Sequence, residues 1–188
     1  SLEPAAPGCP DVDGKAFVLY DAQSGTILAG HNTHEPLPPA SITKVMTALL
    51  AMENLELTDL ITVTAEMFAT IPNDYTRLGL MEGEIITVEQ ALHASLMISA
   101  NDAAMALGLT VGGTLENFVE MMNARARELG CTNTQFTNPY GYADEAHLTT
   151  ACDMALITAE ALKHPIFTEI ATKKNHLLEP TNLFAESR

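Results

Sequence analysis

Residues 38–52 read PPASITKVMTALLAM, and the rest of the chain is organised around them. Prolines are excluded from helix interiors, so Pro38 and Pro39 predict an extended segment that leads to a helix starting at Ser41. The apolar residues that follow recur at intervals of three and four, the spacing of one helix face. The stretch therefore predicts a largely buried helix with Ile42, Val45, Met46, Leu49 and Leu50 on its apolar side.

Ser41 and Lys44 lie in the first turn of this predicted helix and share one face. A serine there is close to unpaired backbone N–H groups and to the positive end of the helix dipole, which stabilise an oxyanion. A lysine can take the serine proton only when it is neutral, and burial beside apolar residues lowers its pKa in that direction. The pair is thus a candidate for covalent catalysis.

The same pattern has a structural interpretation. Ser41 would cap the helix, and Lys44 would extend its charged end into water along the helix surface. A chain of this length contains S-x-x-K about once by chance. The motif alone does not separate the two interpretations.

Composition restricts the classes of function. The chain has 188 residues, which predicts one domain, or one domain with a lobe. With 47% hydrophobic and 18% charged residues it is globular in composition. Its 24 acidic and 9 basic residues give a net charge of -15, which argues against nucleic acids and anionic membranes as partners.

The spacing of the cysteines and histidines indicates neither a metal site nor a disulfide framework. Cys9, Cys131 and Cys152 lack C-x-x-C spacing and are odd in number, so neither a zinc site nor a disulfide framework is indicated. A single Cys131–Cys152 bridge remains open, but we favour buried free thiols. The H-x-x-H pattern at His31 and His34 lacks a helix and a third ligand, so we predict no metal there.

The first residues lack the basic and apolar regions of a signal peptide, so we expect that a leader was removed or the start trimmed. No apolar run reaches the roughly 18 residues that span a bilayer.

The remaining hydrophobic and turn pattern predicts the other elements of the chain. These are an arm at 1–14, a hairpin from 16–21 and 26–29, a strand at 59–63, an extended piece at 79–86, helices at 87–98, 102–111, 115–129 and 150–164, one more turn at 166–170, and a partly extended tail at 173–188.

Ser99-Ala100-Asn101 separates two of these apolar helices. A tight link between such helices is a place where short polar side chains can point into a cleft. The alternative is that Ser99 or Asn101 caps the second helix.

The two motifs, in this order and in these settings, resemble the serine penicillin-binding and β-lactamase superfamily, whose signature is S-x-x-K, then S-x-N, then K-T-G. The residues around the two motifs narrow the resemblance to the D-alanyl-D-alanine carboxypeptidases of the low-molecular-mass penicillin-binding class. It covers roughly Lys15 to the end and is carried by PASITKVMT at 39–47, SANDAA at 99–104, FTNPYG at 136–141 and HLTTACDMA at 147–155.

The resemblance implies a role for each motif residue. Ser41 would be the acylated nucleophile, with its backbone N–H forming half of an oxyanion hole, and Lys44 would be the general base. Ser99 would relay a proton to the leaving amine. Asn101 would hydrogen bond to the substrate amide and to Lys44. No metal or organic cofactor is implied.

The resemblance also implies a fold and a biological setting. The fold class is α+β and β-lactamase/transpeptidase-like, with an antiparallel sheet packed against helices and an all-α lobe, formed by residues 15–188. The activity is removal of the terminal D-alanine from peptidoglycan stem peptides, with β-lactam antibiotics as covalent inhibitors. An extracytoplasmic location follows, and any membrane anchor would lie outside this chain.

One departure is large. The chain has no K-T-G or K-S-G, and its only adjacent lysines, Lys173 and Lys174, are followed by Asn175. Residues 180–184 resemble the segment that precedes the third motif, so we expect a shortened chain with an incomplete sheet and one missing wall of the cleft. Tyr142 stands where the family favours leucine, a minor difference.

Two other functions remain open. A class A β-lactamase-like hydrolase is disfavoured because those enzymes favour S-D-N at the second motif and because no deacylating glutamate can be assigned near Asn138. A non-catalytic binding module would follow if the missing wall is essential. Acylation of Ser41 by a labelled penicillin separates these functions.

Overall fold

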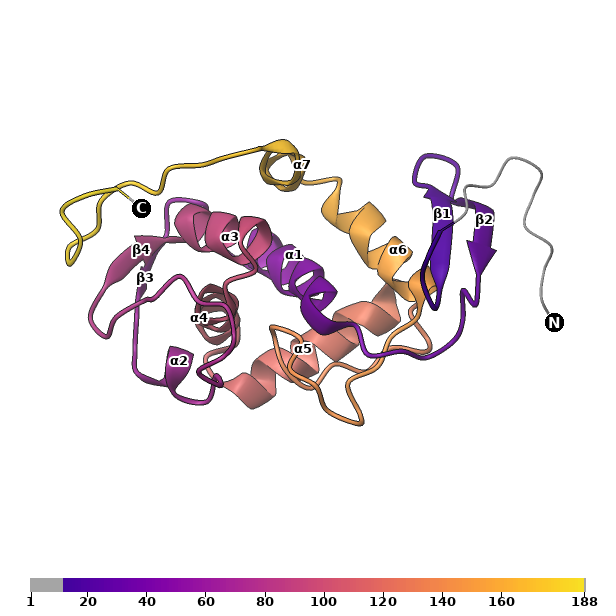
Figure 1. Cartoon of the computed structure of the whole chain (residues 1–188), viewed down its shortest axis with the longest axis horizontal. Coiled ribbons are helices and arrows are strands. Elements are labelled where there is room, and N and C mark those ends of the chain that lie inside the picture. Colours follow the sequence, from indigo (N-terminus) through magenta and orange to yellow (C-terminus); the bar gives the residue numbers. More distant parts are fainter. Residues whose placement is uncertain (1–11, 188) are drawn as a thin grey trace.

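The computed structural model describes residues 12–187, and in it two small antiparallel sheets lie at opposite ends of a helical body (Figure 1). The mixture of helices with fragmentary antiparallel sheet matches the predicted α+β class. Of the predicted arm at 1–14, only residues 12–14 fall within the described residues. Among the described residues, no helix combines the length and the apolarity needed to cross a membrane.

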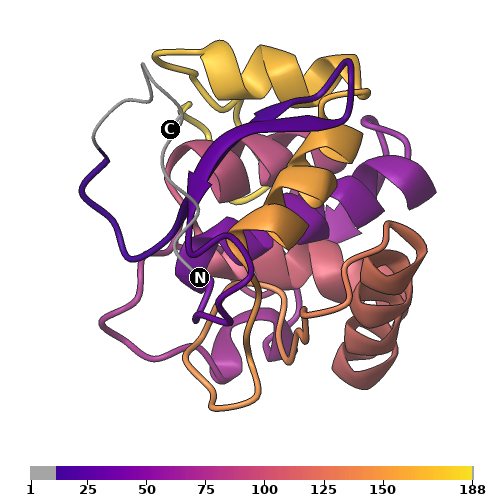
Figure 2. The same cartoon turned by 90° about the vertical axis from the view of Figure 1, so that its right-hand side faces the viewer.

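The first sheet is the predicted hairpin. Strand β1 (Phe17–Asp21) pairs antiparallel with β2 (Thr26–His31), and the register shifts between Leu19 and Tyr20. The Asp21 carboxylate accepts hydrogen bonds from the backbone of Gln23 and the hydroxyl of Ser24, which fixes the turn. The hairpin crosses α6 (Ala151–Ala161), and β1 contacts that helix (Figure 2).

The second sheet is smaller than predicted. Strand β3 (Leu60–Thr62) pairs antiparallel with β4 (Ile85–Thr87), so only the end of the extended piece at 79–86 is a strand. The backbone N–H groups of residues 78–80 donate instead to the carboxylate of Asp102, which removes them from strand pairing. The short helix α2 (Glu66–Ala69) was not predicted.

The predicted helices are present with small changes at their ends. Thr87 and Gln90 have the spacing of a capping box and form one, with each side chain bonded to the other residue's backbone N–H. Thr150 and Asp153 have the same spacing, and Thr150 accepts from the backbone of Asp153, but the Asp153 carboxylate binds elsewhere, so this box is only half formed. The remaining helices are α3 (Val88–Met97), α4 (Asn101–Gly112), α5 (Leu115–Glu128) and α7 (Pro165–Thr172).

The central stretch differs from its prediction at its start. Residues Ala40–Thr43 form a 3₁₀ turn, and the α-helix α1 (Lys44–Asn54) begins only after it. A 3₁₀ turn has three residues per turn rather than 3.6, so it rotates its side chains off the α-helical stripe. Ile42 is accordingly 51% exposed, and its predicted place in the buried face was wrong.

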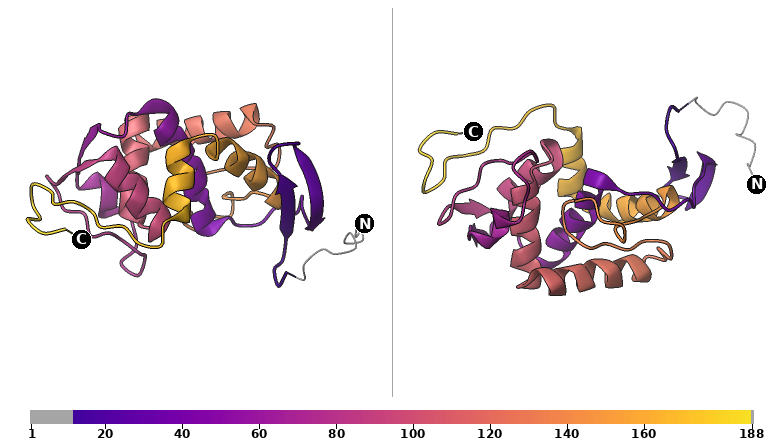
Figure 3. Two further views of the ribbon diagram at one scale, coloured as in Figure 1. Left: turned by 90° about the horizontal axis from the view of Figure 1, so that it is seen from above. Right: turned by 60° about the horizontal axis from the view of Figure 1, so that its bottom comes forward.

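The core surrounds α4, whose first nine residues are all buried. Helix α4 contacts α1, α2, α3, α5 and β3. Helix α7 packs against α3 (Figure 3). A second buried cluster joins α1 to α5, α6 and α7 through the side chains of Met46, Leu49, Leu50, Phe118, Met122, Met154, Ile157 and Phe167.

The tail after α7 follows α3 and β4. Leu178 is buried against Ala94, Ala100 and Ala103, and Asn182 hydrogen bonds to the backbone of residues 83 and 85. His93 is a satisfied core histidine, because it is buried and its ring contacts the Glu89 carbonyl and Lys173 Nζ.

Cys131 and Cys152 are buried free thiols, so the favoured interpretation of these two is confirmed. Burial raises the pKa of the Cys131 thiol to about 12. Cys9 lies outside the described residues.

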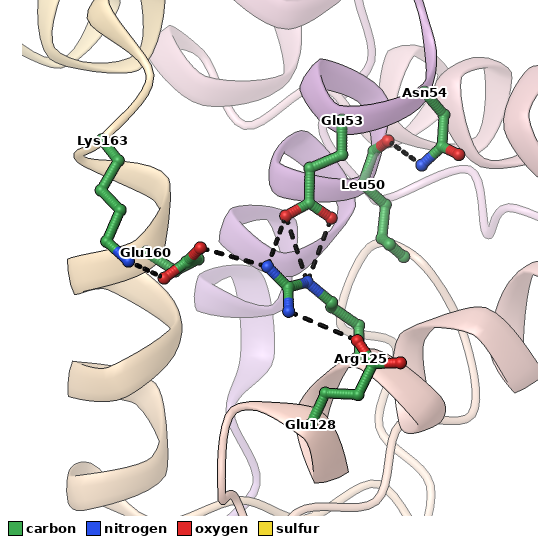
Figure 4. Close-up of polar contacts among 7 residues, drawn as sticks. All are labelled: Leu50, Glu53, Asn54, Arg125, Glu128, Glu160 and Lys163. Atoms are coloured by element: carbon green, nitrogen blue, oxygen red, sulfur yellow. Dashed lines mark hydrogen bonds and ion pairs between the residues drawn. The ribbon is translucent and has the colours of Figure 1, made fainter.

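One cation joins three helices at the surface. Arg125 of α5 donates to both carboxylate oxygens of Glu53 on α1, to Glu160 on α6 and to Glu128 on its own helix (Figure 4). Glu160 also pairs with Lys163. Bidentate guanidinium–carboxylate geometry with several partners is the form of surface ion pair that contributes to stability.

Replacing Arg125 with methionine is expected to lower the free energy of unfolding by about 1–2 kcal/mol at low salt, because several half-exposed ion pairs are lost together. Added salt screens these charges, so the loss is expected to shrink at about 0.5 M NaCl. Urea unfolding followed by circular dichroism measures both. Arg127→Met is the matched control, since no ion pair of Arg127 is present among the described residues. Equal effects of the two substitutions would contradict the prediction.

Candidate active site

Ser41 lies exposed in the 3₁₀ turn that precedes α1. Ala40 before it has a φ of +48°, a left-handed conformation that costs a non-glycine residue energy and is frequent at functional sites. Ser41 makes no capping hydrogen bond, because the residues at the N-cap positions of the turn and of α1 are Pro39 and Thr43. The predicted alternative of a capping serine is therefore wrong.

Lys44, in contrast, is only 2% exposed, so the alternative of a lysine reaching into water is also wrong. Its Nζ lies 3.2 Å from Ser41 Oγ and donates to the backbone carbonyl of Tyr140 at 2.9 Å. Burial lowers the pKa of Lys44 to about 8. A sizeable neutral fraction is thus present near neutral pH, and a neutral amine at this distance can accept the serine proton.

The carbonyl that holds Lys44 belongs to a turn at residues 138–142. Asn138 Oδ1 accepts hydrogen bonds from the backbone N–H groups of residues 140, 141 and 142, and Asn138 Nδ2 donates to the carbonyl of residue 142. The Pro139 carbonyl accepts from Thr47 Oγ1 on α1 at 2.6 Å. One turn therefore binds α1 at two successive helical levels.

Gly141 brings this turn against the serine. Its φ is +90°, and a Cβ there would lie 1.9 Å from the carbonyl oxygen of Ala40 and 3.0 Å from the backbone nitrogen of Ser41. Only a residue without a side chain fits both the conformation and the contact. Sequence reasoning missed this contact and the Tyr140 carbonyl; the resemblance of residues 136–141 was the only signal that pointed to the turn.

The second motif is positioned by the start of α4. Ser99 is half-buried with a φ of +59°, and Asn101 is buried. The backbone N–H of Asn101 donates to the Thr76 carbonyl at 2.9 Å, and the neighbouring Asp102 carboxylate holds the backbone of residues 78–80. Neither Ser99 nor Asn101 caps α4 through its side chain, so the predicted capping alternative is wrong here too.

The structure brings together some of the predicted site residues and not others. Ser41 and Lys44 are in contact, and α4, which begins at Asn101, contacts α1. Among the described residues, however, the hydrogen bonds of Lys44 Nζ go to Ser41 and Tyr140, and the expected bond from Asn101 is not formed. No described group of three or more His, Cys, Asp or Glu side chains is arranged to hold a metal ion.

Comparison with known proteins decides the family. The D-alanyl-D-alanine carboxypeptidase family, peptidase family S11, matches residues 3–184. The chain belongs to this family. The resemblance inferred from the motifs is thereby confirmed.

Among members of the family, the chain is 37% identical to the D-alanyl-D-alanine carboxypeptidase DacF of Bacillus subtilis over 176 residues, which is 90% of this chain and 44% of that protein. It thus spans about half the length of this curated relative. The crystal structure of a D-alanyl-D-alanine carboxypeptidase from Mycobacterium tuberculosis superposes with a TM-score of 0.86 at 30% identity, covering 98% of this chain and 69% of that one.

A mutant of the Streptomyces K15 DD-transpeptidase superposes with a TM-score of 0.87 at 26% identity, covering 95% of this chain and 72% of that one. These two solved structures confirm the predicted fold class.

Proposed function

We propose that this chain carries the nucleophile, the general base and the second motif of a serine D-Ala-D-Ala carboxypeptidase. The observation that supports it most directly is the 3.2 Å approach of a buried Lys44 amine to the exposed Ser41 hydroxyl, combined with the lowered pKa of that amine. The names of the relatives in the same family supply the reaction class.

In the proposed reaction, Ser41 Oγ attacks the carbonyl carbon of the terminal peptide bond of a stem peptide ending in D-Ala-D-Ala. Lys44 Nζ takes the hydroxyl proton as the new C–O bond forms. The C–N bond then breaks, and the departing D-alanine amine receives a proton through Ser99. Water hydrolyses the resulting ester and restores Ser41. A β-lactam forms an ester on the same Ser41 oxygen: its ring C–N bond breaks, and the opened molecule stays attached as a whole.

Asn101 would orient the substrate amide in this scheme. It is buried at the start of α4, a helix that contacts α1, and its backbone N–H donates to the Thr76 carbonyl. The setting that follows is the peptidoglycan outside the cytoplasm, as part of cell-wall biogenesis and cell shape. The net charge of -15 gives no support for nucleic acid as a partner.

A non-catalytic binding module is the second candidate. The observation behind it is an apolar groove of about 410 Å³ beside the serine turn, lined by residues of β1, the 3₁₀ turn, α1 and α6, among them Leu19, Ile42 and Met154. The two candidates differ in one property, which is covalent reaction at Ser41.

The test is incubation of the chain with a fluorescent penicillin, followed by intact mass and peptide mapping. We expect an adduct of one penicillin on Ser41 and none on Ser41→Ala, because that variant lacks the attacking oxygen. A folded chain that gains no mass would overturn the proposal and support the binding module. Stopped-flow kinetics then separates slow deacylation, expected for a carboxypeptidase, from the fast turnover of a β-lactamase.

A further inference from the structure

His147 is a buried histidine whose ring connects two segments that are far apart in the sequence. Its Nδ1 lies 2.9 Å from the backbone nitrogen of Thr137, and its Nε2 lies 2.8 Å from Thr43 Oγ1. A backbone N–H can only donate, so Nδ1 is the acceptor. In the neutral ring the proton is therefore on Nε2, which donates to Thr43.

Thr43 belongs to the 3₁₀ turn that carries Ser41 and directly precedes Lys44. It is fully buried. Among the described residues, the partner of its hydroxyl oxygen is His147 Nε2, which donates to it. The ring thus holds the turn that carries the serine from its buried side.

The other end of the same ring fixes the loop that holds the lysine. Thr137, which donates to Nδ1, directly precedes Asn138, whose side chain builds the 138–142 turn. That turn supplies the Tyr140 carbonyl to Lys44 Nζ. One imidazole therefore joins the nucleophile's turn to the loop that positions the base.

We propose that His147 is a positioning residue, which in its neutral Nε2–H form sets the distance between Ser41 and Lys44. It contacts neither reacting atom and acts through Thr43 and the Thr137–Asn138 backbone. This role rests on the proposed acylation of Ser41. Reacting groups displaced by about 1 Å lose on the order of a hundredfold in rate, so loss of such a link is measurable.

Protonation of the ring breaks the arrangement. A proton on Nδ1 would face the Thr137 N–H, so that hydrogen bond is lost. Burial lowers the pKa of His147, and the nearby Asp144 carboxylate raises it by a smaller amount. On α6, the Asp153 carboxylate is already held by the Thr134 hydroxyl and by the backbone N–H of Asn133.

The direction of the pH effect follows from this shift. The pKa of His147 is lower in the folded chain than the ordinary value of about 6.5. The contact is therefore complete above that value and is lost as the pH falls through the lower, folded-state pKa. Acylation falls tenfold per pH unit below about 8 as Lys44 becomes protonated. At lower pH, where His147 also becomes protonated, it should fall more steeply than the Lys44 titration alone gives, and this additional acid limb belongs to His147.

The experiment measures the acylation rate constant and the concentration of half-saturation for a fluorescent penicillin between pH 5 and 9. We expect His147→Leu to lower the rate constant by about tenfold to a hundredfold with little change in half-saturation. His147→Gln, whose amide can still donate to Thr43 but does not titrate, is expected to recover most of the rate and to lack the acid limb.

His93→Gln is the matched control. His93 is equally buried, but its ring bonds to Glu89 and Lys173. It is expected to lower stability without removing the acid limb. An unchanged acid limb in His147→Gln, or an unchanged acylation rate in folded His147→Leu, would overturn the proposal.

A second readout separates this proposal from the proposed function. Nitrogen-15 NMR of the histidine rings in the unmodified chain reports the tautomer of His147, and a titration reports whether the Thr43 and Lys44 amides respond to it. If no penicillin binds covalently but the Nε2–H tautomer and this response are seen, the catalytic proposal fails alone. A different tautomer refutes the positioning role directly.

Discussion

Replacing Lys44 with methionine is expected to slow acylation of Ser41 by about 100- to 10,000-fold, the usual contribution of a general base. Methionine preserves the buried apolar contacts of the side chain but cannot accept the serine proton. The carbonyl of Tyr140 also loses its donor. The rate constant for reaction with a fluorescent penicillin is the measurement.

The pH dependence of the unmodified chain tests the same role. Because burial lowers the pKa of Lys44 to about 8, the neutral amine increases tenfold per pH unit below that value and saturates above it. Acylation should follow this curve down to the lower pH at which His147 is protonated. Unfolding returns Lys44 to water and restores its ordinary pKa of 10.5, so protonation favours the unfolded chain. The contribution of Lys44 to the free energy of unfolding is therefore most favourable above about pH 10.5 and declines as the pH falls towards 8.

Lys44→Arg separates charge from base catalysis. Arginine retains a cation and hydrogen-bond donors but stays protonated throughout this pH range. It is expected to be as slow as methionine and to lose the titration near pH 8. A fast Lys44→Arg variant would assign the proton transfer to another group.

Substitution of Gly141 by alanine is expected to affect both stability and acylation. The positive φ costs alanine about 1–2 kcal/mol. The new Cβ would overlap the Ala40 carbonyl, which adds a repacking cost of about 1–3 kcal/mol. We expect a total loss of about 2–5 kcal/mol in the free energy of unfolding, together with displacement of the serine turn and a large fall in acylation.

Gly130→Ala isolates the steric part of this effect. Gly130 has a φ of +85° but no atom within 4 Å of its would-be Cβ, so it carries the conformational cost without the collision. It is expected to lose only about 1–2 kcal/mol and to acylate normally. If the two alanine variants unfold at the same denaturant concentration, the contact with Ala40 is not a constraint.

The sequence predicted most of the helices because their signals are local. The capping box at Thr87 and Gln90, the cap at Thr150 and the apolar stripe of α5 all depend on residues within a few positions of each other. Extended segments were less predictable. The backbone of residues 78–80 pairs with the Asp102 carboxylate, a partner more than twenty residues away that no local pattern reveals.

The candidate site shows the same division. Spacing alone placed Ser41 and Lys44 on one face, but it left open whether the amine is buried or reaches into water. The acceptor of that amine is a backbone carbonyl, and every residue has one, so Tyr140 carried no signal of its own. His147 was visible only as part of a resembling segment, since its contact with Thr43 joins residues 104 positions apart, which no local pattern reveals.

The burial of α4 restricts the substitutions that this helix can accept. Its first nine residues are all enclosed, so almost any exchange there disturbs a neighbouring helix. Segment 142–146 is different, because all five of its residues are exposed. Substitutions in that loop are therefore expected to leave the packing of the helices unchanged, whereas substitutions in the first nine residues of α4 are not.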